Sequence, residues 1–287
     1  MSEGQLLVAI VGPTASGKSA LALEAGGLLG GEIINCDALQ MYRSLQIGTG
    51  KPSVGDLKTI THHMYGFLSP NEYYSAGRYM AEAREVCDLV RNRGKIPFVV
   101  GGTGLYLRAL LNGIFKGPGR SDILRGRLDR IRDLYGPQRF HRLLESKDFQ
   151  AAQRISVGDR KRVLRALEVY FLTGSPLSRL QRRQSPLVGY RILKVGLKLS
   201  RSLLYDRINF RVRKMFQTGL LNEVNLLLEK GYDEGCKAFE ALGYRYAVKT
   251  LRGELSLEEA IGLTSRDTRR YAKRQLTWFG KDQEIQW

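Results

Sequence analysis

The chain has 287 residues, of which 43% are hydrophobic and 26% are charged, a composition typical of an ordered globular protein with one sizeable core. Its formal net charge of +18 favours a polyanionic partner, with nucleic acid ahead of a membrane surface. Its three cysteines lack Cys-x-x-Cys spacing and its apolar runs are short, which argues against a disulfide framework, a zinc site, a signal peptide or a membrane span. We therefore expect a soluble, cytoplasmic, monomeric protein.

The first predicted strand, Leu6–Val11, leads directly into a glycine-rich loop that matches the phosphate-binding pattern G-x-x-x-x-G-K-[ST]. The loop consists of Gly12, Pro13, Thr14, Ala15, Ser16, Gly17, Lys18 and Ser19, and a helix is expected over Ser19–Leu29. Glycines let backbone N–H groups converge on an anion, and the following helix directs its positive end to the same place. Lys18 adds a point charge, and the Ser19 hydroxyl can ligate Mg²⁺. A polyphosphorylated ligand is therefore predicted here, whether or not it is a nucleotide.

Two further strands are predicted along the chain. Glu32–Cys36 reads as a strand that delivers Asp37 at its C-terminal end, and Ile96–Val100 reads as a strand that ends in Gly101-Gly102-Thr103-Gly104. The segment between them, Arg78–Arg93, has helical spacing. This alternation predicts an α/β fold with a P-loop NTPase-like parallel sheet core. Ligands gather beyond the carboxyl ends of such strands, so the phosphate loop, Asp37 and Thr103 are expected around one crevice.

Asp37 has two functional interpretations: an acid that holds Mg²⁺ in a P-loop nucleotidase, or a general base beside the phosphate site. A turn-forming aspartate at a strand end is the structural alternative. Nucleotide hydrolases often end the third strand in Asp or Glu, whereas this strand ends in glycines and Thr103. The sequence therefore argues against an ATP-hydrolysing motor and favours backbone and hydroxyl contacts to a ligand.

The character of the chain changes after Gly117. Residues 120–183 contain 16 Lys/Arg and 7 Asp/Glu in a helical pattern, so this stretch carries +9 of the +18. Tyr190–Leu199 then reads as a strand returning to the sheet. The predicted organisation is an α/β core over residues 1–117 and 187–287, with a helical, basic, polyanion-binding insertion over residues 118–186. Loose packing of ordinary helices against the core is the alternative.

The remainder reads as a helical C-terminal segment, with helices expected over Ser202–Thr218, Leu220–Lys230, Leu257–Ile261 and Arg266–Phe279. Arg207 and Arg211 lie one turn apart on the first of these helices and project from one face. We interpret Arg211 as part of a solvated helix face.

Short segments in chain order resemble the motifs of tRNA dimethylallyltransferases, also called tRNA isopentenyltransferases. They span nearly the whole chain and are Gly12–Ser19, Asp37–Tyr42, Ile47–Pro52, His62-His63, Tyr74–Ala76, Gly101–Tyr106, Arg162–Glu168, Gly243–Arg245 and Lys273–Trp278. The phosphate loop alone is shared with many enzymes, whereas the Gly-Gly-Thr, Arg-Ala-Leu-Glu-Val and Lys-Arg-Gln-x-Thr-Trp segments together are specific. The chain departs from these motifs at Gly50 and Gly104, where other residues are usual.

The resemblance implies an enzyme that uses Mg²⁺ and transfers a dimethylallyl group from dimethylallyl diphosphate to N6 of the adenosine 3′-adjacent to the anticodon in tRNA. The phosphate loop would hold the departing diphosphate, with Ser19 at the metal. Asp37 would be the general base, since a neutral exocyclic amine is a poor nucleophile. Thr103 would lie near the target base and the phosphates, and Arg207 would contact the diphosphate.

The resemblance also maps contacts with the tRNA anticodon stem-loop onto Asp37, Ala38, Leu39, Gln40, Thr103, Arg125, Lys161, Arg162, Val163, Leu164 and Arg165. Because the transferred carbon must reach N6, the base has to leave its stack. Tyr42, Tyr244 and Tyr271 are candidates for stacking on it, with core packing as the more frequent use of such tyrosines. His62 and His63 have no third ligand at useful spacing, so we expect a structural or substrate-adjacent loop there and no metal site.

Three other readings stay open on the sequence. Prenylation of free adenine nucleotides shares the chemistry but does not need the basic insertion. A small-molecule P-loop kinase would use arginines of the insertion as a lid. A non-catalytic RNA-binding module leaves the phosphate loop and Asp37 unexplained.

Overall fold

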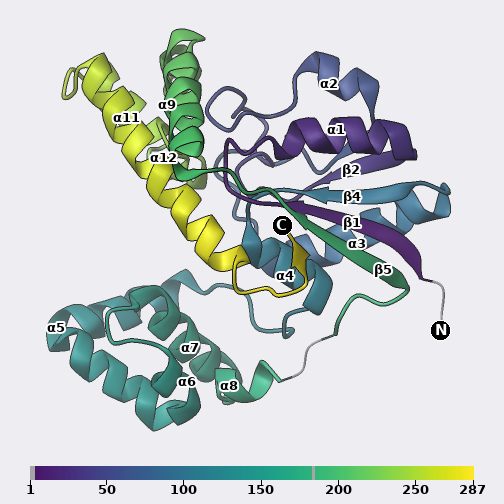
Figure 1. Cartoon of the computed structure of the whole chain (residues 1–287). Helices are drawn as coiled ribbons and strands as arrows, with labels where there is room; N and C mark the ends of the chain where they lie inside the picture. Colours follow the sequence, from purple (N-terminus) through teal and green to yellow (C-terminus); the bar gives the residue numbers. More distant parts are fainter. Residues whose placement is uncertain (1–3, 183–184) are drawn as a thin grey trace. The chain divides into compact units, whose positions relative to one another are not determined.

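The computed structural model describes residues 4–182 and 185–287, and the chain divides into two compact units (Figure 1). Unit 1 consists of Met1–Leu111 and Leu187–Trp287, and unit 2 consists of Asn112–Pro186. Arg183, the last cation counted in the basic stretch, lies outside the described residues.

Unit 1 contains a six-stranded sheet in which each pair of neighbouring strands is parallel. In spatial order the strands are β3 (His62–His63), β2 (Gly31–Asn35), β4 (Ile96–Val100), β1 (Gln5–Val11), β5 (Tyr190–Gly196) and β6 (Ile285–Gln286). The register pairs Ile10 with Val100 and Val11 with Gly196, so β1, β4 and β5 end at one edge of the sheet. This confirms the predicted parallel α/β sheet and places the phosphate loop in its middle.

The two faces of the sheet bury alternate residues of the strands, as a sheet covered on both sides requires. Val8 and Ile10 pack with Ala22 of α1 (Lys18–Leu29), next to which lies α2 (Val54–Thr59) (Figure 1). Leu7 and Ala9 belong to the larger core on the opposite face, with α3 (Ala76–Asn92) and α4 (Gly104–Asn112). On α3 the buried side chains recur at helical spacing, at Tyr79, Ala83, Cys87 and Val90.

The C-terminal segment is helical and packs into the same larger core. It contains α9 (Arg201–Gln217), α10 (Leu220–Glu229), the 3₁₀ helix η1 (Lys237–Glu240), α11 (Tyr244–Leu251) and α12 (Leu257–Phe279). The prediction of two separate helices within Leu257–Phe279 was wrong. A capping box of Ser256 and Glu259 starts one continuous helix, and buried Thr264 and Thr268 hold its middle against neighbours despite weak helix propensity.

Unit 2 is a helical unit with its own core. Its helices are α5 (Asp122–Lys147), α6 (Phe149–Arg154), α7 (Arg160–Thr173) and α8 (Leu177–Leu180). Leu128 and Leu144 of α5 pack with Val163 and Leu167 of α7 in that core. The described basic stretch is therefore a folded helical unit.

Several short elements were missed by the sequence analysis. The strands β3 and β6 contain two residues each, and α2 and α11 contain six and eight, lengths at which periodicity carries little signal. No helix within residues 4–182 and 185–287 combines the length and the apolar character needed to cross a membrane. Cys36 and Cys87 are buried free thiols, and Cys236 is a partly buried one.

Candidate active site

The phosphate loop begins where β1 ends and closes over a cavity of about 400 Å³. Gly12 adopts a φ of +137°, and a Cβ at this position would lie 2.7 Å from the carbonyl oxygen of Leu197, so only glycine fits. The segment from Thr14 to Ala20 lines the cavity, and it includes the first turn of α1. The loop amides and the positive end of the helix are thus gathered at one place, an arrangement suited to an anion.

Three cations lie in the wall of this cavity: Lys18, Arg207 and Arg211. The Nζ of Lys18 donates to the carbonyl of Pro13 at 2.6 Å. Burial lowers the pKa of Lys18 to about 8; the carboxylate of Asp37 acts to raise this pKa and Arg211 acts to lower it further. The proximity of these charges marks the cavity as a site for a multiply charged anion.

The interpretation of Arg211 as a solvated residue was wrong. α9 buries Leu204, Ile208 and Val212 in the core, and this orientation brings Arg211 to the cavity wall. Its Nη2 donates to the carbonyl of Thr49 at 3.1 Å. Burial lowers the pKa of Arg211, and the nearby Asp37 carboxylate opposes the shift.

Asp37 lies two residues after the end of β2 and lines the same cavity. The fully buried Asn35 side chain accepts the Asp37 N–H at 2.9 Å and donates to the Asp37 carbonyl at 3.0 Å. The Oδ1 of Asp37 accepts the Leu39 N–H at 3.0 Å. These bonds fix both the backbone and the carboxylate of Asp37, which leaves Oδ2 as the oxygen for a ligand.

Thr103 lies next to Asp37 in the structure but not in the cavity wall. Its Oγ1 accepts the N–H of Ala38 at 3.0 Å, and its own N–H donates to the carbonyl of Cys36 at 3.1 Å. The side chain of Tyr271 on α12 lies beside that of Thr103, and burial together with the Asp37 carboxylate raises the pKa of Tyr271. The structure therefore brings the predicted Asp37 and Thr103 together and adds Tyr271 to them.

The loop over residues 46–50 closes one side of the cavity, and a residue that sequence reasoning missed holds it. The carboxylate of Glu223 on α10 accepts the N–H groups of Gln46 and Ile47 at 2.9 and 2.8 Å. The hydroxyl of Tyr244 donates to the same carboxylate. The side chain of Gln40 lines the cavity and donates to the carbonyls at the end of this loop. No local pattern around Glu223 could have revealed this role, because the loop amides that it accepts lie more than 170 residues away in the sequence.

Of the three tyrosines predicted as candidates for stacking on a base, two are core residues and one lies at the site. Tyr42 and Tyr244 are 2% and 0% exposed, so both serve the core and stacking on a base is contradicted for them. Tyr271 is partly buried beside Thr103. His63 bonds to Glu32 at 2.6 Å and His62 to the carbonyl of Ile60, which fits the expected structural loop.

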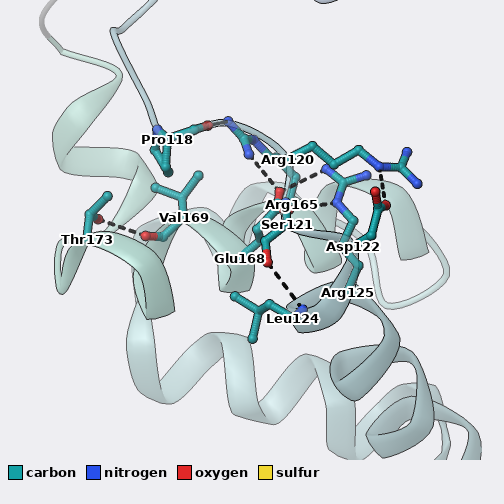
Figure 2. A network of polar contacts seen from close by, with 10 residues as sticks. All are labelled: Pro118, Arg120, Ser121, Asp122, Leu124, Arg125, Arg165, Glu168, Val169 and Thr173. Atoms are coloured by element: carbon teal, nitrogen blue, oxygen red, sulfur yellow. Dashed lines mark hydrogen bonds and ion pairs between the residues drawn. The ribbon is translucent and has the colours of Figure 1, made fainter. Parts of the chain in front are cut away.

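In unit 2, a network of polar contacts surrounds Glu168 of α7 (Figure 2). Arg125 donates to both carboxylate oxygens at 2.8 Å, and Arg165 donates to one at 2.6 Å. The Ser121 N–H donates to the other oxygen at 2.9 Å, and Arg165 also reaches the carbonyl of Pro118. The two predicted tRNA-contacting arginines thus converge on one fully buried carboxylate.

The remaining predicted tRNA contacts on α7 differ in exposure. Lys161 and Arg162 are exposed, whereas Val163 and Leu164 are 1% and 6% exposed and belong to the core of unit 2. The period of α7 explains the difference, since Val163 and Leu164 fall on the same face as the buried Leu167. Ala38 and Leu39 in unit 1 are partly buried against its core.

The ion pairs of Glu168 lead to a prediction for unit 2. Burial opposes ionisation of Glu168, but hydrogen bonds from Arg125, Ser121 and Arg165 outweigh it and lower its pKa to about 2. Glu168→Gln should destabilise unit 2 by about 2 kcal/mol, less than for a fully buried pair because both arginines keep contact with water. Hydrogen exchange of α5 and α7 in the full chain, with increasing urea, measures this difference.

The same pair has a defined pH dependence. A depressed carboxyl pKa contributes stability above the unfolded value near 4.5, and this contribution is lost as the pH falls towards about 2. The difference between the native protein and Glu168→Gln should therefore shrink below pH 4.5. Glu145→Gln, an exposed change on α5, is the control. Equal protection in all three proteins at pH 7 would contradict the prediction.

Oxygen donors near the phosphate loop suit Mg²⁺ better than a softer metal. Ser19 lines the cavity with Asp37, and the buried Ser16 Oγ has no hydrogen-bond partner among the described residues. Within the part of the chain that the structure describes, no group of three or more His, Cys, Asp and Glu side chains could hold a metal. The residues present therefore fit a cation held largely by the phosphates of a ligand, with Ser19 as the protein donor.

Two family models match the chain, the IPP transferase model over residues 40–282 and the Isopentenyl transferase model over residues 5–73. The curated tRNA dimethylallyltransferase of Koribacter versatilis is 44% identical, covering 98% of this chain and 92% of its own length. That of Solibacter usitatus is 46% identical with the same coverage.

Solved structures are similar over nearly the whole chain. The tRNA isopentenylpyrophosphate transferase of Bacillus halodurans is 38% identical with a TM-score of 0.72, covering 99% of this chain and 89% of that one. A eukaryotic dimethylallyltransferase, described as acting on tRNA, is 28% identical with a TM-score of 0.80, covering 96% of this chain and 70% of that one.

Proposed function

This chain belongs to the tRNA dimethylallyltransferase family, and from that premise we propose that it transfers a dimethylallyl group from dimethylallyl diphosphate to N6 of the adenosine 3′-adjacent to the anticodon in tRNA, releasing diphosphate. The observation that carries the proposal is one cavity whose wall holds the phosphate loop, three cations and the Asp37 carboxylate. The cations can stabilise the leaving diphosphate in the same cavity in which Asp37 can take a proton from the acceptor amine.

Binding of the donor, dimethylallyl diphosphate, is proposed from the positive charges in the cavity wall. The backbone N–H groups of the phosphate loop, with Lys18, Arg207 and Arg211, neutralise the diphosphate as the bond between its oxygen and the allylic carbon breaks. Preorganised cations in a partly enclosed cavity stabilise this charge more than water does. The loop after β4 begins with Gly101 and Gly102 and contains no acid that could activate water for nucleotide hydrolysis. This composition favours transfer of a carbon group over hydrolysis of a nucleotide.

The acceptor side of the proposal rests on Asp37. As the bond between N6 and the allylic carbon forms, a proton leaves N6 and passes to the Asp37 carboxylate. Asn35 and Leu39 hold this carboxylate through its backbone and Oδ1, so Oδ2 faces the amine without rearrangement. Thr103, fixed to Ala38, orients the same segment.

The proposed Mg²⁺ ion would bind together with the diphosphate of the donor. Ser19 and the substrate phosphates would hold the ion, with the Asp37 carboxylate near by. When bound, Mg²⁺ supplies positive charge to the departing diphosphate. Lys18 and the two arginines act on the same oxygens and keep them in place.

Recognition of tRNA is proposed for the basic unit 2 together with residues 37–40 of unit 1. Lys161 and Arg162 are exposed, and Arg125 and Arg165 are held in fixed positions by Glu168, which suits contacts with phosphates. Such contacts position an RNA without reading its sequence. We propose that the protein acts as a monomer in the cytoplasm, where its tRNA substrate is found.

Labelled transfer tests this function. Purified protein with Mg²⁺ and [¹⁴C]dimethylallyl diphosphate should label tRNA at the adenosine beside the anticodon, and nuclease digestion should place the label on N6. Label in AMP but not in tRNA would contradict the assignment of the acceptor. Consumption of ATP without any prenyl transfer would contradict the reaction and support a kinase.

The lowered pKa of Lys18 predicts how donor binding depends on pH. With a pKa of about 8 in the free enzyme, Lys18 loses its charge as the pH rises, whereas bound diphosphate favours the charged form. The KM for dimethylallyl diphosphate should therefore rise above pH 8, by up to about tenfold per pH unit. Initial rates at saturating tRNA between pH 7 and 9.5 measure this change. Lys18→Arg stays charged in this range and should remove the rise; a KM of the native enzyme that is independent of pH would contradict the prediction.

A further inference from the structure

The Lys273–Trp278 segment of α12 has no part in the mechanism above, yet it reaches the cavity through one side chain. Gln275 is 5% exposed and lines the cavity. Its Oε1 accepts the N–H of Thr14 at 2.8 Å, and its Nε2 donates to the carbonyl of Gly102 at 3.0 Å. One amide therefore joins the phosphate loop to the loop that carries Thr103.

The backbone at Gly102 is shaped around this amide. A Cβ at Gly102 would overlap the Nε2 of Gln275, so the loop can approach α12 only because residue 102 is glycine. Four residues before Gln275 on the same helix, the side chain of Tyr271 lies beside that of Thr103. Gln275 thus holds the Gly101–Gly104 loop, and Tyr271 lies against the same loop.

Only a neutral amide satisfies both partners of Gln275. The Thr14 N–H needs an acceptor and the Gly102 carbonyl needs a donor, and both groups lie in a partly buried place where an unpaired polar group is costly. A carboxylate would keep the acceptor, lose the donor and add negative charge beside the phosphate site. An aliphatic side chain of the same size would lose both bonds.

We propose that Gln275 is a positioning residue, which couples the phosphate loop to the Thr103 loop and so keeps the allylic carbon and the acceptor amine at reacting distance. The inference rests on the proposed transfer reaction. Gln275 acts through Thr14 and Gly102 and exchanges no proton with the substrates. A displacement of about 1 Å between donor and acceptor is enough to slow a reaction on the order of 100-fold.

Gln275→Leu tests the coupling, with Gln217→Leu, an exposed change at the end of α9, as the matched control. We expect Gln275→Leu to lower kcat by about 100-fold with tRNA affinity, measured by filter binding, within about threefold of the native value. Gln275→Glu should lower kcat similarly and raise the KM for dimethylallyl diphosphate several-fold more than Gln275→Leu. Native kcat in Gln275→Leu would overturn the proposal.

A second pair of variants stays informative if Gln275→Leu folds poorly. Gly102→Ala should be severely impaired in the native background, because its methyl group overlaps the Gln275 amide. In a Gln275→Ala background that overlap is removed, so the double variant should be about as active as Gln275→Ala alone. Multiplicative losses in the double variant would overturn the proposal. Absence of transfer by the native protein would instead contradict the proposed function, which separates the two failures.

Discussion

Replacing Asp37 with alanine is expected to lower kcat by about 100- to 10,000-fold, while tRNA affinity stays close to that of the native protein. The reason is that N6 of adenosine is a neutral amine and must lose a proton as it attacks the allylic carbon. Asp37 lines the same cavity as Lys18 and Arg211, and its position is fixed by Asn35. Single-turnover rates with saturating tRNA and dimethylallyl diphosphate measure the chemical step.

Asp37→Asn separates the loss of the base from a change of structure. Its side-chain oxygen can still accept the Leu39 N–H, so the turn after β2 is kept, but it cannot accept a proton at neutral pH. We expect a loss of kcat of the same order as in Asp37→Ala. Asp233→Asn is the control, because Asp233 is exposed and its Oδ1 accepts the N–H of Gly235 as Asp37 accepts that of Leu39. A turnover unchanged in Asp37→Asn would remove Asp37 from the role of general base.

Arg211→Gln is expected to lower kcat/KM for dimethylallyl diphosphate by about 100-fold. The cation lies in the cavity wall with Lys18, and its guanidinium also fixes the 46–50 loop through the Thr49 carbonyl. Because Arg211 lowers the pKa of Lys18, its removal should also shift the rise of KM with pH to higher pH. Steady-state rates over a pH series measure both effects.

Arg213→Gln, two residues along α9 and exposed, is the matched control for Arg211→Gln. Both changes remove one positive charge from the same helix, so a general effect of charge on tRNA attraction should appear in both. The specific loss should appear in Arg211→Gln alone. Equal kinetics for the two variants would place Arg211 outside the donor site.

The parts of the site that follow strand ends could be predicted from the sequence. The phosphate loop, Asp37 and the Gly101–Gly104 loop each come directly after an apolar run, and a parallel sheet brings such ends together whatever the rest of the chain does. Arg207 was found through a resemblance to a family, and it does line the cavity.

The parts that depend on distant packing could not be predicted. The exposure of Arg211 is decided by which face of α9 the core covers, and two charged residues one turn apart look alike in the sequence. Glu223 and Gln275 bond to segments more than 170 residues away, so no local pattern marks them. Val163 and Leu164, for which a motif match predicts tRNA contacts, lie on the buried face of α7, as the helical period of this stretch indicates.

The central claim is that one cavity holds an isoprenoid diphosphate and a carboxylate that deprotonates an amine. A crystal structure of the protein with dimethylallyl diphosphate and Mg²⁺ tests this most directly. The diphosphate is expected on the Gly12–Ser19 loop, in contact with Lys18, with the allylic carbon on the side of Asp37. A diphosphate bound elsewhere, or an Asp37 carboxylate turned away from the allylic carbon, would contradict it.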